Sequence, residues 1–194
     1  MPPEVKLPKA IRERLKITSV LGTFHGGQKD VFIAQTETER IAVKWVRGYA
    51  TERDKREVEF YEKYKDARGI PKVLEVIQEN HELIIVEEYL PGRNLADCAG
   101  EFIGQDKKIG KLLRDVCGIM DQFWDGDIVH RDLKPANIMI ADDGSPTVID
   151  FGIHRNPENT TITATGAQPG TAVFCAPEQL LPGKREISYR TDFF

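Results

Sequence analysis

Two carboxylates and one amide stand close together in the second half of the sequence, in a pattern that suits metal-assisted chemistry. Asp132 and Asn137 lie five residues apart, and Asp150 follows the next two apolar runs. Mg²⁺ is a hard cation that binds one or two protein carboxylates and completes its shell with phosphate and water. The spacing allows one side chain to accept a proton from an attacking hydroxyl while another binds the metal. Taken alone, an Asp in a loop is more often a solvated turn residue.

The composition is that of a globular protein. The 194 residues include 27 Lys and Arg against 31 Asp and Glu, a formal net charge of −4, and 40% are hydrophobic. Collagen-like, mucin-like and disordered chains are excluded, and a nucleic-acid binder with a broad basic surface is disfavoured. Apolar runs such as Leu83-Ile84-Ile85-Val86 are far shorter than the roughly 20 residues that span a bilayer, so no membrane span is expected.

The amino terminus and the cysteines indicate the compartment. The first nine residues alternate charge and proline where a signal peptide would have an apolar run, so a cytoplasmic protein is expected. The three cysteines, Cys98, Cys117 and Cys175, are far apart and form no Cys-x-x-Cys pair. This predicts neither a disulfide framework nor a structural zinc site, and the cysteines are expected to be small buried hydrophobes.

The first half of the chain reads mostly as strands. Short β-branched and apolar runs separated by turns predict strands at 16–21, 31–35, 40–46, 73–78 and 83–89. A tight hairpin is expected at 36–39. Helical spacing of Val58, Tyr61 and Tyr64 predicts a helix from a Thr51 cap to about Ala67. Five strands and one helix make a small antiparallel lobe.

The pattern changes after Pro91-Gly92-Arg93-Asn94, which we take as the linker between two lobes. An amphipathic helix is predicted from the spacing of Ile109, Leu112, Leu113, Val116, Met120 and Phe123. The runs 138–140 and 148–149, joined by a polar turn, predict a hairpin. After Asp150 the chain loses periodicity for about 25 residues, which is typical of a functional or mobile segment.

The string His130-Arg131-Asp132-Leu133-Lys134-Pro135-Ala136-Asn137, followed by Asp150-Phe151-Gly152, resembles the protein-kinase family. The resemblance is to the Ser/Thr branch of the family, in which a Lys stands two residues after the catalytic Asp, as Lys134 does after Asp132. The resemblance implies an α+β, protein-kinase-like bilobal fold. Its N-lobe would have five antiparallel strands and one helix, and its mostly helical C-lobe would be truncated. The expected divisions are an N-terminal extension at 1–15, an N-lobe at 16–90 and a C-lobe at 91–194 that is incomplete after the A-P-E element.

The same resemblance assigns roles to the charged residues. Ile41-Ala42-Val43-Lys44 resembles the third-strand element, so Lys44 would contact the α- and β-phosphates of ATP. The helix that follows would supply Glu57 as the ion-pair partner of Lys44, with Glu59 and Glu62 as alternatives. Asp132 would accept the substrate proton, Lys134 would steady the γ-phosphate, and Asn137 and Asp150 would hold Mg²⁺.

The nucleotide loop and the hinge depart from the family pattern. The stretch from Leu21 to Val31 stands where the family has its Gly-rich loop. If Val31 matches the family valine, Gly26 fits the middle glycine, whereas Phe24 and Lys29 replace the outer two. A different loop length would instead recruit Gly22 and Gly27.

The string Glu87-Glu88-Tyr89-Leu90 resembles the hinge between the two lobes of the family. Backbone groups of Glu88 and Leu90 would there bond the adenine edge. Glu87 would stand at the back of the pocket, an acid where the family commonly has an apolar or small side chain. Such a charge needs a partner if it is buried.

The segment from Asp150 to Ala176-Pro177-Glu178 resembles the activation loop of the family, and more that of bacterial than of animal Ser/Thr kinases. Arg131 precedes the catalytic Asp and, in the family, pairs with a phosphate on this loop. The expected acceptors are Thr160, Thr161, Thr163 and Thr165. Gly170-Thr171 matches the family's G-T, whose Thr bonds the catalytic Asp and Lys.

The resemblance runs from about Lys16 to Asp192, whose carboxylate would brace the catalytic loop. Two accounts of the short C-lobe stay open: a fragment of a longer chain, or a short kinase whose apolar surface is covered by a partner. The expected function is a Ser/Thr protein kinase that uses ATP, Mg²⁺ and a protein substrate. The alternatives are a nucleotide-binding scaffold without turnover and a small-molecule phosphotransferase of kinase-like fold.

Overall fold

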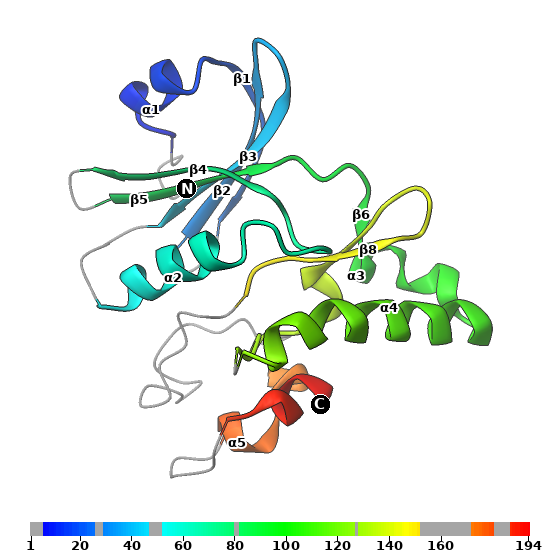
Figure 1. Ribbon diagram of the computed structural model, residues 1–194. Coiled ribbons are helices and arrows are strands. Elements are labelled where there is room, and N and C mark those ends of the chain that lie inside the picture. The colour runs from blue at the N-terminus through cyan, green and yellow to red at the C-terminus, as the bar shows by residue number, and fades with distance from the viewer. Residues whose placement is uncertain are drawn as a thin grey trace. The chain divides into compact units, whose positions relative to one another are not determined.

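The chain forms two compact units in the computed structural model (Figure 1). The first comprises Met1–Tyr61 and Lys72–Tyr89, and the second comprises Glu62–Pro71 and Leu90–Phe194. The structure describes residues 6–25, 29–46, 52–79, 82–126, 128–151, 172–180 and 187–194, without the side chains of 52–57, 79, 172 and 180.

A five-stranded antiparallel sheet with strand order β1-β2-β3-β5-β4 builds the first unit. The strands are β1 (Ile17–His25), β2 (Lys29–Thr36), β3 (Arg40–Val46), β4 (Val73–Glu79) and β5 (Glu82–Glu88). All five predicted strands are present, and β1 runs on to His25. The predicted hairpin at 36–39 is confirmed, because the Thr36 N–H donates to the Glu39 carbonyl at 2.8 Å.

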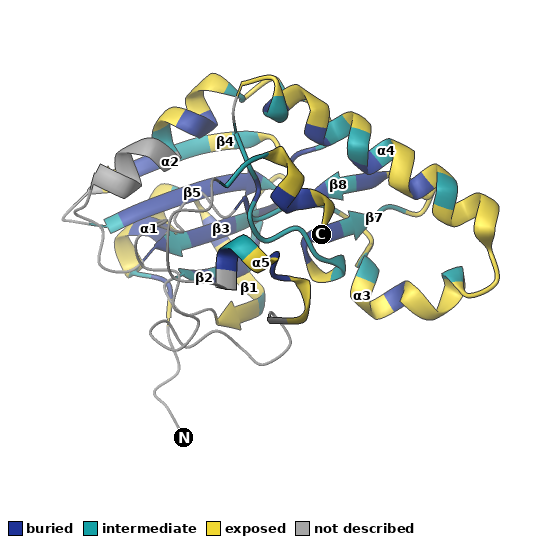
Figure 2. Cartoon of the chain, turned by 90° about the horizontal axis from the view of Figure 1, so that it is seen from below, coloured by how far each residue is buried: buried dark blue, intermediate teal, exposed yellow. Residues whose placement is uncertain are grey.

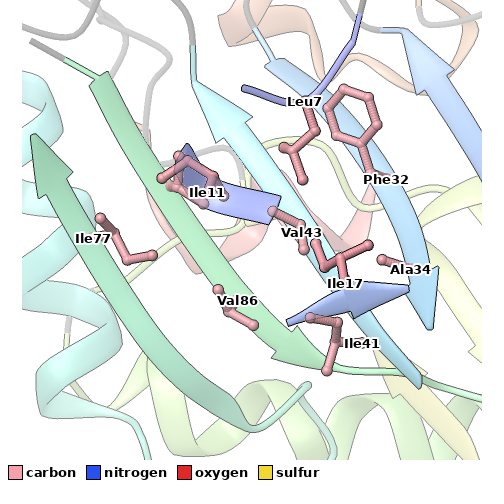
Figure 3. Packing of buried hydrophobic residues seen from close by; sticks show 10 residues of the cluster. Leu7, Ile11, Ile17, Phe32, Ala34, Ile41, Val43, Ile77 and Val86 are labelled. Atoms are coloured by element: carbon pink, nitrogen blue, oxygen red, sulfur yellow. The ribbon is translucent and has the colours of Figure 1, made fainter. Parts of the chain in front are cut away.

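Side chains alternate between the two faces of this sheet. On one face, apolar residues of all five strands form a buried cluster that includes Ile17, Phe32, Ala34, Ile41, Val43, Ile77 and Val86 (Figure 3). Ile84 belongs to the same cluster. The other face carries Val31, Lys44 and Glu87, because Val31 stands opposite Lys44 and Glu87 stands opposite Ala42 in the strand register. One face of the sheet therefore carries the buried apolar cluster, and the other carries the charged side chains of Lys44 and Glu87.

A short helix that the sequence analysis missed covers the apolar face. Ile11 on helix α1 (Lys9–Arg14) and Leu7, just before the helix, lie in the buried cluster, each 5% exposed (Figure 3). Leu15 packs against the same cluster. Leu7, Ile11 and Leu15 recur every four residues between charges, which is the helical signal that could have revealed this element.

Ile11→Ala should lower the free energy of unfolding of the first unit by about 2–4 kcal/mol, because it removes a buried side chain and leaves a cavity. Arg12→Ala, on the exposed side of the same helix, is the matched control. Denaturant unfolding monitored by Trp45 fluorescence measures both. Equal midpoints for the two variants would show that α1 does not contribute to the core.

Helix α2 (Glu52–Lys63) follows β3 and is shorter than the helix expected at 51–67. Its last turns bury Phe60 and Tyr61, whose ring centroids lie 5.6 Å apart. Figure 1 draws α1 and α2 on opposite sides of the sheet. The predicted Thr51 cap lies outside the described residues.

The second unit is built on one long helix and a small sheet. Helix α4 (Asp106–Trp124) buries Leu112, Val116, Met120 and Phe123, whereas Ile109 and Leu113 of the predicted apolar face are exposed (Figure 2). The antiparallel sheet orders β6 (Arg93–Asn94), β7 (Ile138–Ile140) and β8 (Pro146–Val148). Part of the expected linker at 91–94 therefore pairs with β7 as a strand.

The remaining elements of the second unit are short. They are helices α3 (Leu95–Cys98) and α5 (Pro177–Leu180) and 3₁₀ turns at Ala99–Phe102, Pro135–Asn137, Ala172–Phe174 and Tyr189–Phe193. The segment at 62–71 joins this unit because the Gly69 carbonyl accepts from the Val148 N–H at 2.8 Å and the Arg68 backbone bonds Gln122. Among the described residues, no helix is long and apolar enough to cross a membrane.

Candidate active site

A buried histidine joins the loop at 130–137 to the end of the β7–β8 hairpin. The His130 Nε2 lies 3.0 Å from the Ile149 carbonyl oxygen, and its Nδ1 lies 3.2 Å from the Asp132 amide nitrogen. Because a carbonyl accepts and an amide donates, the ring is neutral and carries its proton on Nε2. The ring also packs against Phe151, with ring centroids 4.6 Å apart, and Phe151 packs on Phe123, with ring centroids 4.7 Å apart.

Burial lowers the pKa of His130 below its ordinary value, despite the nearby carboxylate of Asp192, which acts in the opposite direction. The unfolded chain therefore binds a proton below about pH 6.5 that the folded chain does not bind. The free energy of unfolding should fall as pH drops from 7.5 to 5.5, with a slope of up to about 1.4 kcal/mol per pH unit from this residue.

Urea unfolding of wild type and His130→Asn across this pH range measures the contribution of His130. The variant should be less stable at pH 7.5 and should have a shallower dependence on pH. Parallel pH profiles would contradict a neutral buried imidazole.

Asp192 holds the backbone of the same loop. Its Oδ2 accepts from the His130 amide at 2.8 Å and from the Trp124 Nε1 at 3.0 Å, and its Oδ1 accepts from the Arg131 amide at 2.8 Å. Arg131 has a φ of 65°, in the left-handed region that a residue with a side chain seldom adopts. The buried carboxylate thus stabilises a strained turn immediately before Asp132.

Gln179 holds the same turn from the other side, a contact that the sequence analysis missed. Its Nε2 donates to the Arg131 carbonyl at 2.7 Å, and its Oε1 accepts from the Ala176 amide at 3.1 Å. Gln179 follows the A-P-E string directly and is 4% exposed. A polar residue at this place beside an apolar stretch was the available signal.

Two polar side chains of the loop bond the carboxylate of Asp132. Lys134 Nζ lies 3.0 Å from Asp132 Oδ2, and Asn137 Nδ2 lies 3.2 Å from the same oxygen and 2.8 Å from the Asp132 carbonyl. The side chains of Lys134 and Asp132 are 19% and 17% exposed. Asp132 is therefore oriented by two donors while part of it stays accessible to a substrate.

Asn137 and Asp150 are brought together by backbone pairing. The Ile149 amide donates to the Asn137 carbonyl at 2.9 Å, and Asp150 follows with a φ of 61°. Because Asn137 Nδ2 bonds Asp132, its Oδ1 is the atom with the chemistry to bind a cation. One amide oxygen and one carboxylate fit Mg²⁺, which keeps several non-protein ligands. The described residues contain no cluster of three or more His, Cys, Asp and Glu that could hold a metal.

In the first unit, Lys44 pairs with Glu87. Lys44 Nζ lies 2.7 Å from Glu87 Oε1, and both side chains are buried. The expectation that a buried Glu87 needs a partner is therefore met. The side chain of Glu57, expected as the partner of Lys44, lies outside the described residues. The two alternatives, Glu59 and Glu62, lie on α2 and are exposed.

The rest of the predicted nucleotide site is placed in part. Gly22 lies inside β1, and Val31 stands opposite Lys44 on β2. Glu88 ends β5, where its amide donates to the Lys72 carbonyl and its carboxylate accepts from the Lys72 amide, both at 2.9 Å. Leu90 begins the second unit after β5. The predicted residues outside the described part are Gly26, Gly27, Thr160, Thr161, Thr163, Thr165 and Thr171.

His25 and Asp30 form a pair that sequence reasoning missed. They are partners in the β1–β2 register, and His25 Nδ1 lies 2.8 Å from Asp30 Oδ1. The Asp30 side chain is fully buried, whereas His25 is half-exposed. This pair joins the end of β1 to the start of β2.

This chain belongs to the protein kinase domain family, whose model matches residues 16–194. The α+β, kinase-like fold predicted from the sequence is confirmed. The chain is similar to bacterial serine/threonine kinases. It is 33% identical over 184 residues to the probable serine/threonine-protein kinase PknB of Corynebacterium glutamicum, covering 87% of this chain and 28% of that protein.

Two relatives from Streptomyces coelicolor extend the comparison. The serine/threonine-protein kinase AfsK is 28% identical over 176 residues, covering 87% of this chain and 22% of AfsK. The probable serine/threonine-protein kinase SCO3848 is 30% identical over 205 residues, covering 96% of this chain and 29% of the relative. The chain thus spans less than a third of the length of these curated relatives.

Proposed function

We propose that this chain transfers the γ-phosphoryl group of ATP to Ser or Thr hydroxyls of a protein. The observation that carries the proposal is the Asp132 carboxylate, held by Lys134 Nζ and Asn137 Nδ2 on a loop whose backbone is bonded to Asp192. A partly accessible carboxylate in a loop held by hydrogen bonds suits a base that accepts a hydroxyl proton. The similarity to named serine/threonine-protein kinases supports the same chemistry.

The proposed reaction assigns one task to each group. The substrate oxygen forms a bond to the γ-phosphorus while the bond to the β-phosphate oxygen breaks, and Asp132 receives the hydroxyl proton. Lys134 steadies the charge on the γ-phosphate. Lys44, with Glu57 as a proposed partner, orients the α- and β-phosphates. Positioning and charge neutralisation supply most of the rate in such a scheme.

The proposed cofactors are ATP and Mg²⁺. Asn137 and Asp150 would hold the metal, which would neutralise phosphate charge. Backbone groups of Glu88 and Leu90 would bond the adenine, and Gly22, Gly26, Gly27 and Val31 would border the phosphates. A protein is the proposed second substrate.

The proposed regulation is phosphorylation of the segment after Asp150. Thr160, Thr161, Thr163 and Thr165 would accept phosphate, Arg131 would pair with it, and Thr171 would bond Asp132 and Lys134. A phosphate facing an arginine forms charge-assisted hydrogen bonds that can order a loop. The Arg131 backbone is already fixed at both its amide and its carbonyl.

Incubation of the full chain with Mg²⁺ and γ-labelled ATP, with a generic protein substrate such as casein, tests the proposal. We expect label on Ser or Thr of the substrate, phosphate on at least one of the four threonines by mass spectrometry, and loss of both on chelation with EDTA. Nucleotide binding with no transfer to any protein would favour the scaffold alternative. Transfer to a small alcohol or amine but not to protein would favour the small-molecule phosphotransferase.

A further inference from the structure

A buried ion pair links two strands of the first unit at the edge of the hinge. Lys44 Nζ and Glu87 Oε1 are 2.7 Å apart, with side chains 6% and 4% exposed. In the β3–β5 register, Ala42 stands opposite Glu87 and Ile85 stands opposite Lys44. Lys44 and Glu87 are thus diagonal neighbours on one face of the sheet, which is within reach of long side chains.

Burial makes the contact between these two charges matter more than it would at the protein surface. A charge removed from water is stable only when an opposite charge and hydrogen bonds replace its hydration. The chain offers a contrast, because Arg14 and Glu75 form an ion pair of the same 2.7 Å length with side chains 43% and 38% exposed. Removing a partner at the exposed pair costs little, since water solvates the remaining charge.

The backbone around the Lys44–Glu87 pair restricts its geometry. β3 and β5 are paired at every position from Ile41 to Val46, and β5 is buried throughout Leu83–Glu87. The distance between the two Cα atoms is therefore set by the sheet ladder. A glutamate on α2 would depend instead on how that helix is placed.

We infer that Glu87 is a positioning residue that holds the Lys44 ammonium in place from within the sheet. In this way Glu87 would fix how Lys44 contacts the nucleotide phosphates. The inference rests on the proposed function for the role of the phosphates. An ammonium has three donors, so a bond to Glu87 is compatible with bonds to phosphate oxygens. The family resemblance assigned Glu87 only to the back of the pocket, and Glu57 to Lys44.

Steady-state kinetics of Glu87→Gln in the full chain test the anchor, with Glu75→Gln as the matched control. Losing one positioning contact should raise the KM for ATP about tenfold or more in Glu87→Gln. Glu75→Gln should match wild type. A variant that merely folds less well has fewer active molecules and therefore a lower apparent kcat with an unchanged KM. An unchanged or lower KM for ATP in Glu87→Gln overturns the inference.

A second readout needs no catalytic activity. Acetylation of Lys44 by an amine-reactive reagent, quantified by peptide mass spectrometry, should rise several-fold in Glu87→Gln relative to the exposed Lys111, and should not rise in Glu75→Gln. Unchanged labelling of Lys44 overturns the inference. If wild type neither binds Mg·ATP nor transfers phosphate, the proposed function fails, and the labelling alone then decides whether Glu87 holds the amine.

Glu57→Gln ranks the two glutamates in the same assays. If the sheet anchor dominates, Glu57→Gln raises the KM for ATP and the labelling of Lys44 less than Glu87→Gln does. A larger effect of Glu57→Gln on both measurements assigns the anchoring role to α2 and overturns the inference.

Discussion

Asp132→Asn should lower kcat for phosphoryl transfer by about 10²–10⁴-fold, because it removes the proposed base while keeping the shape of the side chain. The amide can still accept from Lys134 Nζ, which lies 3.0 Å from the Asp132 carboxylate in wild type. The affinity for Mg·ATP should change little. Label transfer from γ-labelled ATP measures kcat, and titration with a fluorescent nucleotide measures the affinity.

Asp143→Asn is the matched control for this experiment. Asp143 lies in the exposed turn of the β7–β8 hairpin, where it accepts from the Ser145 amide and hydroxyl. Its replacement should leave transfer unchanged. Asp150→Ala should instead weaken the binding of Mg·ATP as well as transfer, because it removes a proposed metal ligand. Equal turnover by wild type and Asp132→Asn would defeat the assignment of Asp132.

Asp192→Asn should lower the free energy of unfolding by about 3–5 kcal/mol, because three N–H donors lose a charged acceptor. The amide also presents an NH₂ group to at least one of the donors from His130, Arg131 and Trp124. The same change should reduce kcat, since the strained turn at Arg131 precedes Asp132 directly. Chemical denaturation and the label-transfer assay measure the two effects.

Asp121→Asn controls for a general effect of charge removal on α4, where Asp121 is exposed. It should change neither stability nor transfer. An Asp192→Asn protein with wild-type stability would show that the bonds from Asp192 are replaced by water. If Asp192→Asn were destabilised but fully active, the bonds to Asp192 would contribute to stability and not to catalysis. That result would contradict the proposed effect of Asp192 on Asp132.

Much of the fold could be predicted because its signals are local. The five strands of the first unit follow from short β-branched runs, and the hairpin at 138–148 follows from two apolar runs joined by a polar turn. The proximity of Asp132, Lys134 and Asn137 follows from their spacing within one short loop. Each of these features depends on residues only a few positions apart, so a period or a string is enough to reveal it.

Helix α1 shows where local reading failed although a signal existed. Leu7, Ile11 and Leu15 have helical spacing, but six residues of helix are too short to be stable alone. The apolar cluster formed by residues of all five strands stabilises it, and most of those residues are far away in the sequence. The signal was therefore present in the sequence, whereas the stability of α1 comes from the packed sheet.

By itself, the sequence determined the family, the strand pattern and the loop that holds the candidate base, because these are encoded by neighbouring residues. The expected brace from Asp192 to the catalytic loop is confirmed by its bonds to the amides of His130 and Arg131. Only the tertiary structure decided which other distant partners meet: Lys44 with Glu87 across 43 positions, and Gln179 with the Arg131 carbonyl. The physical reason is that the energy of a charge depends on its burial and on the few ångströms to its nearest partner. Those quantities are set by strand register and packing, which no string of neighbouring residues contains.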